Sequence, residues 1–196
     1  MRDIPSITHA NKLHPAISKT VIAGIEDAEN KMGPNYAVRI VQSMRTIEYQ
    51  NALYNQPYDH IDNDHDGKID EPDEKVTNAK GGCSYHNYGL AFDFCLLFFN
   101  TQLNKYEFHP VRSWEINKIW MIVVDVFKKL GFIWGADWDN DGLTKAQGDK
   151  DEHLVDGPHL QKTFNYNWRD LLAKYNRKDF IPGTQFVNLK KSPAAD

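Results

Sequence analysis

The chain has 196 residues, of which 41% are hydrophobic and 26% are charged, and its formal net charge at pH 7 is −4. This length suits one globular domain over residues 1–196, with room for a substantial core, and is short for two domains. No apolar run approaches the roughly 20 residues that a membrane helix needs, which excludes a membrane-inserted protein.

The N-terminal stretch MRDIPSITHANKLHPA lacks the apolar core of a secretory signal peptide. We therefore expect a protein made in the cytoplasm, whose export would need help from elsewhere. Its two cysteines, Cys83 and Cys95, are too few for a disulfide framework and are expected to be free thiols.

Hydrophobic periodicity predicts the elements of the first half of the chain. Apolar residues three to four apart predict a helix over residues 14–32, which Gly33 and Pro34 end. Alternation and β-branched residues predict a strand over 36–44, and Thr46 can cap a helix that runs to residue 56. Residues 76–83 are expected to form a loop.

The second half begins with a buried strand at GLAFDFCLLFF, residues 89–99. Ser113 can cap a long helix that Gly131 ends. Its expected core face consists of Ile116, Ile119, Trp120, Val123, Val126 and Phe127. Short extended segments are predicted at 132–135 and 158–164, and residues 190–196 are expected to fray. The predicted class is α+β, with helices packed against a small mixed or antiparallel sheet.

The chemistry of the sequence centres on an aspartate inside the apolar strand. Asp93 lies on the strand face opposite Phe92 and Phe94, and a buried carboxylate is costly unless something pairs with it. His86, seven residues earlier, and His159, in the segment DGPHLQ, complete a plausible three-ligand zinc set whose fourth position is open to water. Asp156 then lies near the metal as a natural general base. A partly buried histidine that only hydrogen-bonds to an aspartate is the alternative.

Four segments resemble motifs of one known family. SYHNYGLAFDF resembles the SxHxxGxAxD signature of zinc peptidases that cut peptidoglycan stem peptides, among them L-alanyl-D-glutamate endopeptidases and D-alanyl-D-alanine carboxypeptidases. DGPHLQ resembles their second motif, MRTIEYQNALY their arginine motif, and FIWGADW a stretch of the branch that includes phage endolysins. The motifs follow the family's order from about Arg45 to Gln161.

The resemblance implies zinc ligands at His86, Asp93 and His159, with Asp156 as the catalytic acid and base. Many relatives carry glutamate at that last position, and aspartate is a variant of phage endopeptidases. Arg45 would hold the substrate near its scissile carbonyl, because its planar donor fork suits a carboxylate-rich peptide. A surface ion pair is the alternative for an arginine outside such a motif.

Two acidic segments, residues 59–75 and 137–152, contain 14 of the 27 acidic side chains, so the rest of the chain is basic. A basic body suits an anionic polymer such as nucleic acid or the bacterial cell wall. The first segment fits a calcium loop, with ligands at positions 1, 3, 5, 7, 9 and 12. The expected ligands are Asp62, Asp64, Asp66, the carbonyl of Lys68, Asp70 and Asp73. A solvated charge run is the alternative.

The second acidic segment repeats only the start of the calcium pattern. Its expected ligands are Asp137, Asp139, Asp141 and the carbonyl of Leu143, with a final carboxylate from Asp149, Asp151 or Glu152. Trp138, inside this segment, could stack on substrate or pack in the core.

The sequence thus predicts a monomeric zinc and calcium metallopeptidase that acts on the L-Ala to D-Glu bond of peptidoglycan, without nucleic-acid or membrane partners. We expect a phage lysin that reaches the periplasm and cell wall through a holin-made hole. The alternatives are a D-alanyl-D-alanine carboxypeptidase or dipeptidase, and a calcium-dependent wall-binding module without catalysis.

Overall fold

A computed structural model describes residues 1–141, 144 and 155–190. These residues form two compact units, one made of residues 1–44 and 89–163 and the other of residues 45–88 and 164 onward. The expectation of one domain over residues 1–196 stays a prediction. No helix among the described residues is long and apolar enough to cross a membrane.

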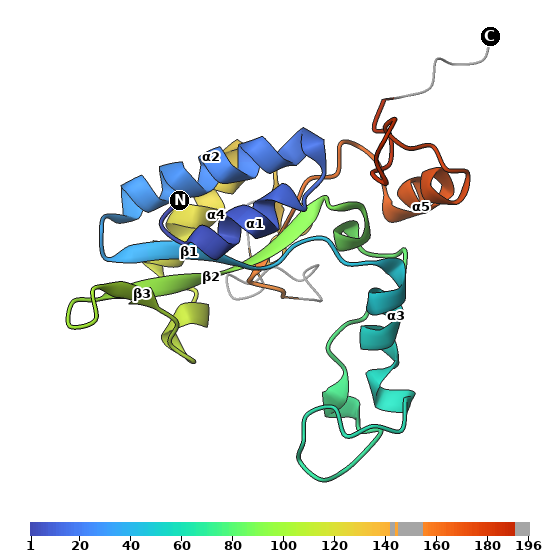
Figure 1. The fold of residues 1–196 in the computed structure, drawn as a ribbon, viewed down its shortest axis with the longest axis horizontal. Coiled ribbons are helices and arrows are strands. Elements are labelled where there is room, and N and C mark those ends of the chain that lie inside the picture. The colour runs from blue at the N-terminus through green and yellow to red at the C-terminus, as the bar shows by residue number, and fades with distance from the viewer. Residues whose placement is uncertain (142–143, 145–154, 191–196) are drawn as a thin grey trace. The chain divides into compact units, whose positions relative to one another are not determined.

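The first unit contains an antiparallel sheet and three α-helices (Figure 1). The sheet has the strand order β1-β2-β5-β4, and β3 pairs with the C-terminal end of β2. The strands are β1 (Tyr36–Gln42), β2 (Ala91–Asn100), β3 (Lys105–Glu107), β4 (Ile133–Trp134) and β5 (His159–Gln161). The helices are α1 (Ile4–Asn11), α2 (Pro15–Met32) and α4 (Lys118–Lys129). This arrangement confirms the predicted α+β class.

The core of this unit forms where the apolar face of β2 meets α4. The ring centroids of Phe94 and Trp120 lie 4.3 Å apart, and those of Phe92 and Phe127 lie 5.0 Å apart. All four side chains are fully buried. Because side chains alternate along a strand, packing Phe92 and Phe94 inward turns Asp93 to the other face of the sheet.

The predicted start of the long helix is wrong. Asn117 caps α4, and its side chain accepts hydrogen bonds from the backbone N–H groups of Ile119 and Trp120. Ser113 instead lies in a short 3₁₀ helix, Arg112–Trp114, where its hydroxyl accepts from the backbone of His109. Ile116 therefore precedes the helix and is exposed, outside the core.

The second unit contains α3 (Ile47–Asn55), α5 (Trp168–Asn176) and three short 3₁₀ helices, Gln56–Tyr58, Pro72–Glu74 and Tyr85–Tyr88. Thr46 caps α3 as predicted, accepting a hydrogen bond from the backbone of Tyr49. The hydroxyl of Tyr85 donates to the carbonyl of Tyr166 at 2.6 Å, which ties the two chain segments of this unit together.

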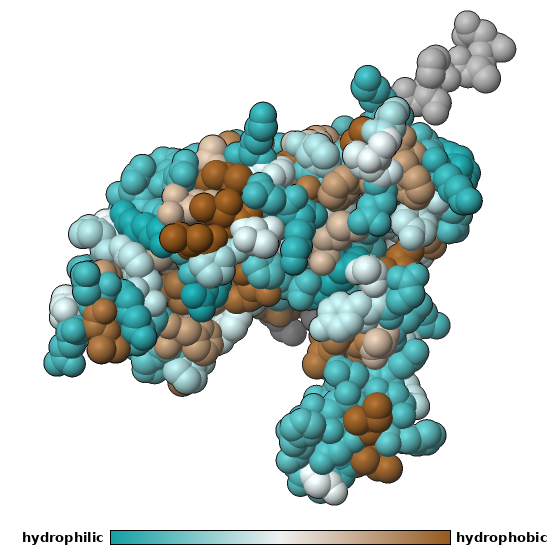
Figure 2. Space-filling model, in the orientation of Figure 1, coloured by the Kyte–Doolittle hydropathy of each residue, from teal (hydrophilic) through white to brown (hydrophobic). Residues whose placement is uncertain are grey.

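Apolar groups are scattered over the visible face of the molecule in Figure 2. One brown group covers the region of α1, where Ile4 and Ile7 are exposed. The helices α1 and α5 were not predicted from the sequence. In α1 the buried side chains are only Ser6 and Ala10, so the helix shows no apolar periodicity that would predict it.

Candidate active site

Asp93 and His159 face each other on neighbouring strands. β2 and β5 pair antiparallel, and the register places Asp93 directly opposite His159. Directly opposed side chains lie on the same sheet face and within reach of each other. The His159 Nδ1 atom accordingly lies 3.2 Å from Asp93 Oδ1. The strand register thus brings together two residues that are 66 positions apart in the chain.

Burial and charge act in opposite directions on His159. Burial lowers its pKa, but the hydrogen bond and negative charge of Asp93, together with the charge of Asp156, raise the pKa above its usual value. The second ring nitrogen, Nε2, lies 3.0 Å from Gln161 Oε1. Both ring nitrogens therefore face oxygen acceptors, and this arrangement favours the protonated, positively charged form of the His159 ring.

His86 lies in the second unit, in the 3₁₀ helix Tyr85–Tyr88, and is buried. Its backbone carbonyl accepts a hydrogen bond from the backbone N–H of Arg45 at 3.0 Å. The hydroxyl of Ser84 accepts from the backbone N–H of His86 at 3.3 Å. The backbone that carries His86 is thus held on both sides.

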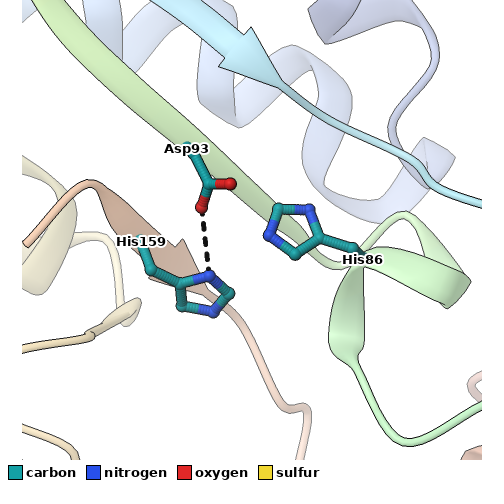
Figure 3. A group of neighbouring side chains, drawn as sticks. All are labelled: His86, Asp93 and His159. Atoms are coloured by element: carbon teal, nitrogen blue, oxygen red, sulfur yellow. Dashed lines mark hydrogen bonds and ion pairs between the residues drawn. The ribbon is translucent and has the colours of Figure 1, made fainter. Parts of the chain in front are cut away.

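The side chains of His86, Asp93 and His159 form a group that could hold a metal ion (Figure 3). One potential ligand atom from each residue lies within 4.8 Å of the other two. Two imidazoles and one carboxylate suit zinc, and three protein ligands leave a coordination position for water or substrate, as in catalytic rather than structural zinc sites. The donor chemistry of the three side chains therefore fits the predicted ion.

Asp156 lies in a tight turn that ends at His159. The Asp156 carbonyl accepts a hydrogen bond from the His159 backbone N–H at 3.1 Å, and Asp156 is partly exposed. The indole N–H of Trp134 donates to the Gly157 carbonyl at 2.7 Å inside the same turn. The WGADW segment therefore braces the backbone that carries the predicted base.

Trp138 lies beside the predicted ligand His159. Their ring centroids are 5.3 Å apart with an interplanar angle of 42°, and Trp138 is partly exposed. The side chain is thus available both to pack on the histidine and to meet a substrate.

Arg45 immediately precedes α3 in the second unit and is partly exposed. Its guanidinium donates a long hydrogen bond, 3.4 Å, to the side-chain oxygen of Gln50. Gln50 is fully buried and donates in turn to Thr77 and to the carbonyl of Ala79. The arginine motif therefore contains a fixed acceptor for its own arginine.

Asn87 is a site residue that sequence analysis missed. This buried side chain donates to the carbonyls of Arg45 and Thr46 at 3.2 and 3.3 Å, and it accepts from the backbone N–H groups of Gly82 and Ser84. The asparagine joins the arginine motif to the loop that precedes His86. Its place next to His86 in the sequence was a signal, but its long-range partners were not visible there.

The first acidic segment forms only part of the predicted calcium loop. Carboxylate oxygens of Asp62, Asp64 and Asp66 lie within 4.8 Å of one another, and they accept hydrogen bonds from backbone N–H groups of the loop. Asp70 instead binds the backbone and ring of His60, and Asp73 is exposed on a 3₁₀ helix. The structure therefore groups three of the five predicted carboxylates.

The Lys68 side chain lies over this segment and pairs with Asp66 at 3.0 Å and with Glu71 at 3.2 Å. Glu74, which was not among the predicted ligands, is buried, and its carboxylate accepts hydrogen bonds from the backbone N–H groups of Asn63 and Glu71. Its spacing from Glu71, three residues, is that of a capping box.

The second acidic segment groups Asp137, Asp139 and Asp141, again within 4.8 Å. Asp137 is buried and forms an ion pair with Lys128 of α4. The remaining predicted ligands, Leu143 and a carboxylate from Asp149, Asp151 or Glu152, lie outside the described residues.

Comparison with known proteins identifies the class to which the chain belongs. The model of a family described as D-alanyl-D-alanine carboxypeptidase matches residues 77–142, a range that contains His86 and Asp93. The chain is also 34% identical over 149 residues to the peptidoglycan L-alanyl-D-glutamate endopeptidase CwlK of Bacillus subtilis (strain 168). That alignment covers 76% of this chain and 72% of CwlK. The chain belongs to the M15 family of zinc peptidases.

Proposed function

We propose that this peptidase hydrolyses the bond between L-Ala and D-Glu of peptidoglycan stem peptides, with His86, Asp93 and His159 as its zinc ligands. The grouping of these three side chains within 4.8 Å of one another is the observation that carries the proposal. The choice of bond follows CwlK, which is an L-alanyl-D-glutamate endopeptidase and is 34% identical to this chain.

When bound, zinc supplies Lewis-acid polarisation of the scissile carbonyl and lowers the pKa of an attacking water molecule. The Asp156 carboxylate would act as the general base that takes a proton from the attacking water and then as the general acid that gives this proton to the leaving amine. Arg45 binds a substrate carboxylate or carbonyl through its donor fork, and Gln50 orients the guanidinium.

Mass spectrometry of digested peptidoglycan tests this proposal. We expect the wild type to release new D-Glu amino termini, and the His159→Ala variant to release none. Asp156→Asn should lose activity while retaining zinc, whereas Asp125→Asn, an exposed aspartate of α4, should behave as the wild type. Absence of new D-Glu amino termini with zinc supplied would refute the assigned bond.

A D-alanyl-D-alanine carboxypeptidase is the second candidate, because the matching family model carries that description. The same digest distinguishes it, since loss of terminal D-Ala without new D-Glu termini would identify a carboxypeptidase. Binding to peptidoglycan without any cleavage, unaffected by His159→Ala, would identify a wall-binding module.

We further propose that calcium binds at Asp62, Asp64 and Asp66, with the Lys68 carbonyl, Asp70 and Asp73 as the remaining ligands, and that Asp137, Asp139, Asp141 and Leu143 form a second, related site. Each cluster supports the proposal because its lysine partner, Lys68 or Lys128, pairs with one of the three carboxylates, so a divalent cation would offset the remaining repulsion. Asp70 would have to leave His60 to join the first site. Calorimetric calcium titration of the wild type, of an Asp62→Asn/Asp66→Asn variant and of an Asp139→Asn/Asp141→Asn variant should show one site lost in each double variant. A wild type without calcium uptake would refute both sites.

The resemblance of the WGADW segment to phage endolysins supports a lytic role for a monomer delivered through a holin-made hole. Expression in bacteria with and without a holin tests this route. Lysis that requires the holin is the expected result, and lysis independent of it would contradict the route. Sedimentation of the purified protein would reveal any state other than the monomer.

A further inference from the structure

Gln161 contacts the predicted zinc ligand His159 from the side that faces away from Asp93. The two residues are two positions apart on β5, so their side chains lie on one face of the sheet. Gln161 Oε1 lies 3.0 Å from His159 Nε2, and Gln161 is only 8% exposed. Figure 3 shows Asp93 reaching the other ring nitrogen.

The distances identify which ring nitrogen faces the metal position. Ligands of a tetrahedral zinc ion lie about 2.0–2.2 Å from the ion and therefore roughly 3.3–3.5 Å from one another. His159 Nδ1 and Asp93 Oδ1 are 3.2 Å apart, so a shared ion requires them to separate by only a few tenths of an ångström. Nδ1 is thus the nitrogen placed to bind the ion.

A histidine that binds a metal through Nδ1 carries its remaining proton on Nε2, and this N–H needs an acceptor when it is buried. Gln161 Oε1 is placed to accept it. A neutral amide can fill this role without adding a further negative charge beside Asp93 and Asp156.

The backbone of Gln161 is fixed by the sheet. It pairs with Ala91 of β2 on one side and with Ile133 of β4 on the other. Trp138 packs on the ring of His159 as well. The acceptor therefore sits on a strand held from both sides, which limits how far its oxygen can move from Nε2.

We propose that Gln161 is a positioning residue for metal binding: its side-chain oxygen accepts the His159 Nε2 proton, fixes the tautomer and ring plane of His159, and so presents Nδ1 to the ion. This inference rests on the proposed assignment of His159 as a zinc ligand. No step of peptide hydrolysis is needed to test it.

Zinc affinity, measured by competition with a chromophoric chelator, tests the role of Gln161. Gln161→Met keeps the length of the side chain and removes the acceptor, and we expect zinc to bind about 10–100-fold more weakly. Gln161→Glu keeps an acceptor and adds charge, so it should bind zinc at least as tightly as the wild type. Gln185→Met, an exposed glutamine in the second unit, is the matched control and should leave the affinity unchanged.

The outcomes separate this inference from the zinc site itself. A wild type that binds no zinc, or a His159→Ala variant that binds it as tightly as the wild type, would overturn the metal site and the inference together. Tight zinc binding by the wild type and equally tight binding by Gln161→Met would overturn the inference alone. Histidine ¹⁵N NMR of the zinc-loaded wild type gives a second readout that requires no variant to fold. The His159 proton is expected on Nε2, and finding it on Nδ1 would overturn the proposal.

Discussion

Gly135 and Asp156 lie so close together that no side chain fits between them. The Asp156 backbone N–H donates to the Gly135 carbonyl at 2.7 Å, and a Cβ atom on Gly135 would lie 2.3 Å from the Asp156 carbonyl oxygen. The same Cβ would lie 3.0 Å from the Cβ of His159. Gly135, the second residue of the WGADW segment, thus determines how near the DGPH turn can approach β4.

Gly135→Ala should therefore displace both Asp156 and His159. A shift on the order of 1 Å at a catalytic group can cost about 100-fold in rate, and we expect a loss of this size in peptidoglycan hydrolysis. Overpacking of this kind also lowers the free energy of unfolding by about 1–3 kcal/mol.

Gly33→Ala provides the matched control. Gly33, at the end of α2, has φ +80° and ψ 177°, a conformation nearly restricted to glycine, but an added Cβ would meet nothing within 4 Å. Its cost is backbone strain of about 1–3 kcal/mol. We expect the two variants to lose similar amounts of stability, and we expect only Gly135→Ala to lose activity. Equal activity in the two variants would show that the close approach is unimportant for catalysis.

Asn87→Ala should weaken the link between the arginine motif and the His86 loop. The change leaves two N–H groups, of which that of Gly82 is buried, and two carbonyls without their side-chain partner, and an unsatisfied buried group costs about 1–3 kcal/mol. We expect lower stability in urea denaturation and a lower kcat/KM, because Arg45 and His86 are both held by this backbone.

Asn51→Ala is the control for Asn87→Ala, since Asn51 is exposed and accepts one hydrogen bond from the neighbouring Gly81. It should cost less than Asn87→Ala in both measurements. An Asn87→Ala protein with normal stability and kcat/KM would contradict the assigned role.

Most of the fold could be predicted because its elements carry strong local signals. The helix over Pro15–Met32 and the strand Ala91–Asn100 show clear apolar patterns. The start of α4 was misplaced because Ser113 and Asn117 are both good caps, and only tertiary packing decides between them. For α5 a signal existed in the capping box that begins at Asn167.

The candidate site was predictable at the level of motifs, because the residue types and their order define the chemistry. Its supporting contacts were not, since no motif marks them and they depend on how the chain folds around the site. Gln161 meets His159 because both lie on one strand face, and Asn87 meets Arg45 across 42 positions of sequence. The partner of Asp137, Lys128, is likewise set by the turn after α4 and has no motif of its own.

The two cysteines should differ sharply in reactivity. Burial raises the pKa of Cys95 to about 12, so at pH 8 only about one thiol in ten thousand is ionised. Cys83 is partly exposed, and both cysteines are free. We expect a disulfide reagent to label one thiol rapidly in the native protein and two in denaturant. Rapid labelling that persists in Cys83→Ser would contradict the burial of Cys95.

Glu29 should make the stability of the protein depend on pH. This glutamate of α2 is buried, and burial raises its pKa above the ordinary value of 4.5, although the backbone N–H groups of Val38 and Arg2 that donate to it act to lower the pKa. The folded protein thus holds the Glu29 proton more tightly than the unfolded chain. This group therefore stabilises the fold fully below pH 4.5, and the contribution is lost as the pH rises through the raised folded pKa.

Comparison with Glu29→Gln isolates this effect, because glutamine does not ionise and all other titrating groups are shared. Urea denaturation of both proteins, with metal removed by a chelator, should give a free-energy difference between wild type and variant that shifts against the wild type as the pH rises from 4 to 7. A difference that moves in favour of the wild type over this range would mean that the N–H groups facing the Glu29 carboxylate outweigh the cost of its burial.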